Sequence, residues 1–153
     1  MARAVPKKIL VATDFSETSD EAVRHAQELA TALRASLHLL HVVSSDLGPG
    51  APELWGVYSD DLLKRLEAKA KTELDQLCAT LARDGVVPHA VTRLGGEADT
   101  INDYAREQEI DLIVIGTHGR GGVEHLLLGS VAEKVVRGAP CPVLVVRPSP
   151  PKP

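Results

Sequence analysis

Glycine and serine residues that follow an apolar run form the part of the sequence best suited to bind a ligand. The run 112–115 is short and apolar and ends at Gly116, which indicates a buried strand. More glycines follow as far as Gly122, and Gly129 and Ser130 then precede a helical pattern. Glycine has no Cβ, so backbone N–H groups can approach a ligand closely, and a helix start adds further N–H groups. The pattern predicts an anion site, for which phosphate is the best fit. The alternative is a flexible loop with Ser130 as an ordinary helix N-cap.

The spacing of these glycines resembles that of a known family. Gly116-x-x-Gly119, nine residues, and Gly129-Ser130 match the G-2x-G-9x-G-[S/T] pattern of the ATP-binding branch of the universal stress protein family. The segments VATDFSE at 11–17 and LLHVV at 39–43 resemble two other characteristic segments of that family. The resemblance extends from residue 7 to residue 147 and implies an ATP site, with Mg²⁺ as a second expected ligand.

The resemblance also implies which residues meet the nucleotide. Asp14 would accept hydrogen bonds from adenine or ribose, or hold a hydrated Mg²⁺, although an Asp after a strand is also a common turn residue. Arg120 would reach a phosphate with two donors, or remain a solvated loop arginine. The residues expected at the nucleotide are Ala12, Thr13, Asp14, Val42, Gly116, Gly119, Arg120, Gly129, Ser130 and Val131.

No catalytic residue is assigned. His118 and His125 suggest a base or a metal pair, but nothing beside them supplies other ligands, so we expect both on an exposed loop. The other four histidines, His25, His38, His41 and His89, are interpreted as structural. The sequence has no P-loop, no G-x-G-x-x-G turn after the first strand, and no lysine in the glycine loop. Because phosphoryl transfer needs strong charge stabilisation, we expect slow hydrolysis or none.

Composition excludes several classes of protein. The 153 residues are the length of one domain, here 1–153 with a frayed tail at 149–153. Lys and Arg number 17 against 21 Asp and Glu, a net charge of −4 without a long basic run, which argues against nucleic acid as a partner. Cys78 and Cys141 fit neither a disulfide framework nor a metal site. No apolar run reaches transmembrane length and the start lacks a signal sequence, so we expect no membrane span and a cytoplasmic location.

Strand and helix patterns alternate along the chain, which predicts an α/β fold with a mainly parallel, doubly wound, open Rossmann-like sheet. The predicted strands are 8–13, 37–43, 86–94, 111–115 and 143–146, and the predicted helices are 18–33, 59–83, 98–108 and 130–137. Thr18 and Glu21 suggest a capping box at the start of the first helix. The resemblance implies the strand order 3-2-1-4-5, which places the first and fourth strands side by side at a topological switch point.

The sequence therefore predicts an ATP-binding universal stress protein with a regulatory or stress-protective role. We expect a homodimer paired through the edge strand 142–147, because an apolar edge needs a cover. The loop 44–58 with Trp55 is either a lid that orders on nucleotide binding or disordered. One alternative is an interaction module with a weak or vestigial nucleotide site. A less favoured one is a nucleotide-cleaving or nucleotidyl-transferring enzyme.

Overall fold

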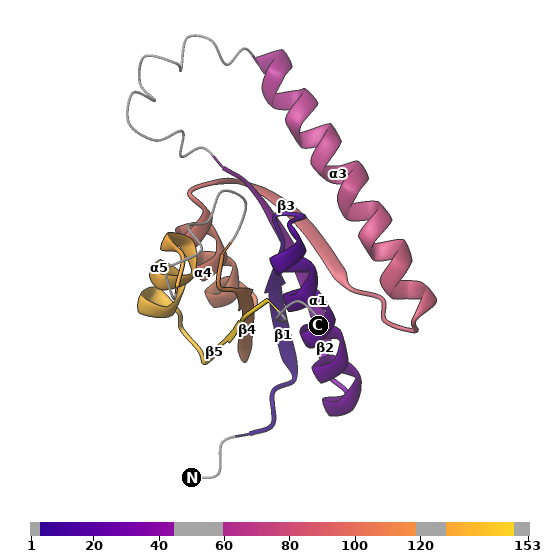
Figure 1. The fold of residues 1–153 in the computed structure, drawn as a ribbon, viewed down its shortest axis with the longest axis vertical. Coiled ribbons are helices and arrows are strands. Elements are labelled where there is room, and N and C mark those ends of the chain that lie inside the picture. Colours follow the sequence, from indigo (N-terminus) through magenta and orange to yellow (C-terminus); the bar gives the residue numbers. More distant parts are fainter. Residues whose placement is uncertain (1–3, 45–59, 119–127, 149–153) are drawn as a thin grey trace, which may run out of the picture.

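A five-stranded parallel sheet organises the described part of the chain, residues 4–44, 60–118 and 128–148 of a computed structural model. Its strand order is β3-β2-β1-β4-β5, so the predicted fold class and order are confirmed (Figure 1). The strands are β1 (Lys8–Ala12), β2 (Ser36–Ser44), β3 (His89–Gly95), β4 (Leu112–Gly116) and β5 (Val143–Val146). The helices are α1 (Glu17–Leu33), α3 (Asp60–Arg83), α4 (Glu97–Glu107) and α5 (Ser130–Gly138).

The central strand β1 is apolar on both faces because helices cover both sides of the sheet. Ile9, Leu10 and Val11 are fully buried. Ile9 lies level with Leu37 of β2 on one side and with Leu112 of β4 on the other. Since successive side chains alternate between faces, Ile9 and Val11 enter one core and Leu10 enters the other.

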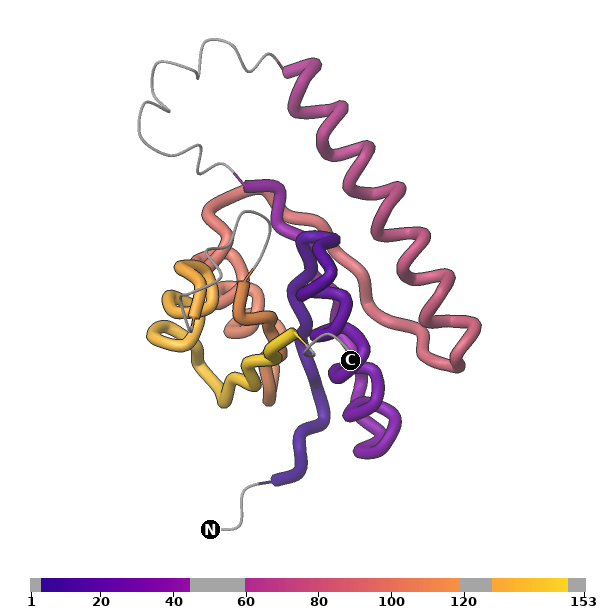
Figure 2. Tube along the Cα trace, in the orientation of Figure 1, coloured from indigo at the N-terminus to yellow at the C-terminus, as the bar shows by residue number. Residues whose placement is uncertain are grey.

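The helices form two layers, one on each face of the sheet (Figures 1 and 2). Buried residues of α1 and α3 pack on one face, where Ala22, Ala26 and Leu74 belong to the same core as Val11. Buried residues of α4 and α5 pack on the other face. The helix after β1 and the helix after β4 thus cover opposite faces, which is the arrangement expected at a topological switch point.

Two local predictions are wrong. The third strand begins at His89 rather than at residue 86, and Val87 is 82% exposed. The first helix is capped by Ser16, whose side chain accepts a hydrogen bond from Ser19 N at 3.2 Å. The predicted capping box at Thr18 is therefore two residues too late, because Ser16, in the turn between β1 and α1, already supplies the acceptor.

Several predictions concern residues outside the described ranges. They are Trp55 with most of its loop, Gly119, Arg120, His125 and the tail 149–153. Within the described ranges, no helix is both long enough and apolar enough to span a bilayer.

Candidate functional site

A crevice of about 710 Å³ lies at the carboxyl ends of β1, β2 and β4. Residues of α3, α4 and α5 complete its lining. Because β1 and β4 are neighbours whose following helices cover opposite faces, this is the switch point of the sheet, where ligands bind in open α/β folds. The volume is within the roughly 300–1,000 Å³ typical of small-molecule sites.

The structure brings together the predicted site residues that it describes. These residues come from the ends of three strands and from the start of α5. The members that line the crevice are Ala12, Thr13, Asp14, Val42, Gly116, Gly129, Ser130 and Val131. Gly119 and Arg120 fall outside the described residues.

The turn between β1 and α1 is held by its own side chains. Asp14 Oδ1 accepts a hydrogen bond from Ser16 N at 3.0 Å, and Thr13 Oγ1 accepts one from Phe15 N at 3.0 Å. Thr13 Oγ1 also lies 3.2 Å from Ser19 Oγ in the first turn of α1. These bonds hold Phe15 at φ 63°, an uncommon conformation for a bulky residue. Asp14 therefore has the structural role of a turn residue and also lies on the crevice.

The start of α5 presents backbone donors without a side-chain cap. Its N-cap is Gly129, and Ser130 is the first helical residue, so Ser130 is not the cap that its sequence position suggested. Gly129 N donates to Thr117 O at 2.6 Å, and no side chain caps the helix start. The first N–H groups of a helix have no partner within the helix and carry the positive end of its dipole. An anion in the crevice can meet these groups.

Two glycines are required by the packing of the crevice. A Cβ at Gly129 would lie 2.7 Å from Thr117 O and 3.3 Å from His118 Nδ1. At Gly116, a Cβ would lie 2.8 Å from Thr18 Cγ2. Gly129 has φ −69°, which any residue adopts, so its requirement for glycine is steric.

Two side-chain atoms of the crevice residues are buried without a partner in the described structure. They are Thr117 Oγ1 and His118 Nδ1, and Thr117 is only 3% exposed. Both residues line the crevice. His118 lies in a loop as predicted, but it is only partly exposed and its Nδ1 is buried, so the expectation of an exposed histidine is wrong. A buried polar atom without a hydrogen bond costs about 1–3 kcal/mol, so a bound ligand or water that supplied one would be stabilised.

Sequence reasoning missed His41, which it interpreted as structural. His41 lines the crevice, and its Nδ1 donates a hydrogen bond to Thr13 O at 2.8 Å. Its ring stacks on Phe15, with 4.5 Å between centroids. His41 thus has a structural role in holding the β1–α1 turn and also contributes to the crevice.

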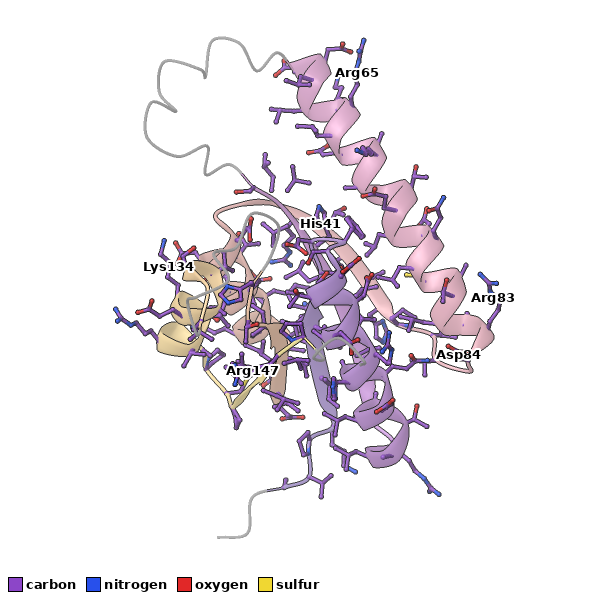
Figure 3. The ribbon with its side chains drawn as sticks, in the orientation of Figure 1. His41, Arg65, Arg83, Asp84, Lys134 and Arg147 are labelled. Carbon is purple, nitrogen blue, oxygen red and sulfur yellow. The ribbon has the colours of Figure 1, made fainter. Side chains whose placement is uncertain are left out.

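The crevice also contains charges from the helices that sequence reasoning did not include. Four carboxylates and two lysines are found among the described lining residues: Asp14, Glu73, Glu97, Asp99, Lys69 and Lys134. One signal was available in the sequence. Gly95 ends β3 and Gly96 directly precedes α4, as Gly129 precedes α5, and neither Gly96 nor Gly129 has a side-chain hydrogen bond at the helix start. Figure 3 labels His41 on β2 and Lys134 on α5.

Within the described residues, no group of three or more His, Cys, Asp or Glu side chains could hold a metal ion. Any ion held by Asp14 would therefore need most of its ligands from water and from a bound molecule.

Comparison with known proteins gives one family. The model of the universal stress protein family matches residues 6–147. Universal stress protein MJ0531 of Methanocaldococcus jannaschii is 38% identical over 143 residues, which cover 92% of this chain and 82% of that protein.

Two solved structures share the fold closely. The structure of MJ0577, a universal stress protein of the same organism, superposes with a TM-score of 0.83 at 29% identity, covering 97% of this chain and all of the other. A universal stress protein in complex with cAMP superposes with a TM-score of 0.72 at 25% identity, covering 95% of this chain and 100% of the other.

Proposed function

This chain belongs to the universal stress protein family, and we propose that it binds ATP as a regulatory or stress-protective homodimer. In this proposal, residues 1–153 form a single nucleotide-binding domain in the cytoplasm. One observation carries it: the uncapped start of α5 at Gly129 opens onto the crevice at the switch point of the sheet.

The crevice offers different chemistry to the two ends of a nucleotide. At the α5 end, the N–H groups of Ser130 and Val131 and the buried Thr117 hydroxyl suit phosphate oxygens. At the β2 end, Val42 is 9% exposed and gives adenine an apolar contact with backbone groups beside it. A site of about 710 Å³ with an apolar end and a donor-rich end fits a nucleotide.

ATP is the proposed nucleotide because of the glycine pattern from Gly116 to Ser130. The related universal stress protein in complex with cAMP supports an adenine nucleotide in this fold. Mg²⁺ would reach the site with the phosphates, with Asp14 as an outer ligand through water. Hydrolysis is proposed to be slow or absent, because phosphoryl transfer needs strong charge stabilisation and the described residues of the lining carry two lysines against four carboxylates.

Calorimetric titration with ATP tests the proposal, with GTP at the same concentration as the control. We expect saturable 1:1 binding of ATP and weaker binding of GTP. A chain that binds neither nucleotide, yet is folded and dimeric, would contradict the ATP proposal and favour an interaction module. Product analysis after incubation with ATP and Mg²⁺ then measures turnover.

The homodimer is proposed through β5, which is one edge of the sheet. Leu144 in this strand is 38% exposed, while Val145 packs against the core on the α4–α5 face. An apolar edge is a liability unless a partner covers it, and the same strand of a second copy can pair with it about a two-fold axis.

Leu144→Lys tests the proposed pairing of β5 more selectively than Val145→Lys, because a lysine at Val145 would also disturb the core. We expect a dimer for the natural sequence and a shift towards monomer for Leu144→Lys in analytical ultracentrifugation at micromolar concentration. Val87→Lys is the matched control, since Val87 is exposed but lies beside the opposite edge strand. A natural chain that sediments as a monomer would contradict the dimer proposal.

A further inference from the structure

The geometry of α5 points to Lys134 as the residue that distinguishes long phosphate chains from short ones. This inference rests on the proposed nucleotide function and adds a determinant of specificity to it. Sequence reasoning left the phosphate charge to backbone donors, because the glycine loop holds no lysine. The folded structure brings a lysine to the crevice from one turn inside the helix.

The position of Lys134 follows from helix geometry. Ser130 and Lys134 are four residues apart in α5, so they lie on the same face of the helix. Cα–Cβ bonds in a helix tilt towards its N-terminus, which directs the side chain of Lys134 back towards Ser130 and the crevice. Both residues line the crevice. A phosphate chain that begins at the helix start would extend towards the ammonium group.

Lys134 forms no ion pair within the described residues, whereas a neighbouring cation does. Arg137 lies on the same helix and pairs with Glu133 at 2.7 Å, and its side chain is 78% exposed. Arg137 is not among the residues that line the crevice. The helix therefore carries one cation held by its own glutamate and one that is directed to the crevice.

The charge around the crevice explains why a lysine here affects specificity. The described lining carries Asp14, Glu73, Glu97 and Asp99, so each added phosphate meets repulsion as well as the donors of α5. Lys69 on α3 is the other cation of the lining, and Glu73 follows it one turn later on the same helix face. Among the described lining residues, Lys134 is the cation closest in sequence to the start of α5, and the terminal phosphates of ATP, which AMP lacks, would extend towards it.

The test compares Lys134→Met with Arg137→Met. Each variant removes one positive charge, so both change the net charge equally, and methionine keeps most of the apolar stem. Dissociation constants for ATP, ADP and AMP are measured by calorimetry at fixed salt with EDTA, so that bound Mg²⁺ does not replace the lysine. Thermal melts establish that each variant is folded.

We expect Lys134→Met to weaken ATP binding about fivefold and AMP binding less than twofold, the size of an exposed charge contact. Lys134→Glu should weaken ATP binding more, and Arg137→Met should leave the preference for ATP over AMP unchanged. An unchanged preference in Lys134→Met would overturn the inference while leaving the ATP proposal intact. A natural chain that binds none of the three nucleotides would overturn the ATP proposal itself.

Discussion

Two groups of polar residues in this chain, each with a buried member, differ in whether the buried polar atoms have hydrogen-bond partners. One is the crevice, where Thr117 Oγ1 and His118 Nδ1 have no partner within the described structure. The other is a group between β2, β3 and α4, here called the His38 cluster, whose members contact one another closely. It consists of His38, His89, Arg93, Tyr104 and Glu107.

The contacts of the His38 cluster form a continuous set. His38 Nδ1 lies 2.8 Å from Tyr104 Oη, and the His38 ring stacks on His89 with 4.9 Å between centroids. Arg93 lies over the Tyr104 ring at 4.8 Å and pairs with Glu107 at 2.8 Å. Tyr104 is 3% and His38 7% exposed, so these two residues join α4 to the sheet within the core, while His89 and Glu107 lie at the surface.

The difference separates polar atoms whose hydrogen bonds stabilise the fold from polar atoms that a bound molecule could still satisfy. A polar group that already has its partner adds to stability, whereas one without a partner costs stability until something binds. A third unpartnered atom, Asn102 Oδ1, lies on α4, where its amide nitrogen would be 2.7 Å from a Cβ at Gly138 of α5. Lack of a partner thus indicates a ligand site only where a crevice is also present.

The largest expected effect comes from adding a side chain at Gly129, which lines the crevice. Gly129→Val places a side chain against Thr117 O, which a Cβ alone approaches to 2.7 Å. We expect ATP affinity to fall at least tenfold, about 1.4 kcal/mol, because the start of α5 must move. Overpacking of this kind also costs about 1–3 kcal/mol of stability. Calorimetry measures the change in affinity, and urea denaturation measures the change in stability. If the variant is folded and binds ATP normally, the start of α5 is not part of the binding site.

A smaller effect, on stability alone, is expected from Tyr104→Phe. The change removes the hydroxyl that meets His38 Nδ1 and leaves that nitrogen buried. We expect the free energy of unfolding to fall by about 1–2 kcal/mol, with ATP affinity unchanged within about twofold. Urea denaturation and calorimetry measure the two. A loss of binding without a loss of stability would mean that the two regions are coupled.

The opposite result is expected from Thr117→Val, which removes a hydroxyl and keeps the shape. Because Thr117 Oγ1 has no partner in the described structure, the free energy of unfolding should stay the same or rise by up to about 1 kcal/mol. ATP affinity should fall about two- to fivefold, since the hydroxyl is expected to meet a phosphate. A clear loss of stability without nucleotide would show that the hydroxyl has a partner in the free protein.

The smallest expected effect is a pH dependence of stability from the His38 cluster. Burial is the main cause that lowers the pKa of His38 below 6.5, and the charges of His89 and Lys8 add to it. The folded chain therefore binds fewer protons than the unfolded chain just below pH 6.5, so stability is lost as the pH falls through that range. The urea concentration at the midpoint of unfolding should rise as the pH is raised from about 5 to 7, and this rise should be smaller in His38→Asn.

The sequence was sufficient to predict the strands and helices, whose apolar patterns repeat along the chain. Apolar β-branched runs such as 112–115 predict strands because they are buried on both faces. The positions of Val42 and Gly116 follow from the ends of such runs, and that of Gly129 from the start of the helical pattern that follows it. The strand order came from the resemblance, since right-handed crossovers alone leave several orders open.

Features that depend on distant parts of the chain were missed. Lys134 and Glu97 join the crevice only because α4 and α5 begin at the same edge of the sheet, which no local pattern shows. His41 was interpreted correctly as structural, yet its contact with Thr13 also brings it to the crevice. His118 Nδ1 lies close to Gly129, 11 residues later, a contact that cannot be read from the spacing in the sequence.

The central position of β1 also determines the order in which the sheet can form during synthesis. β1 pairs with β2 soon after both leave the ribosome, but its other edge must wait for β4. The carboxylate of Asp111, which accepts a hydrogen bond from Lys8 N, is 103 residues further along the chain. Contacts over such separations form slowly. The crevice is lined by both Val42 and Gly129, so the proposed nucleotide site is complete only after the chain has been made at least as far as Gly129 and has folded.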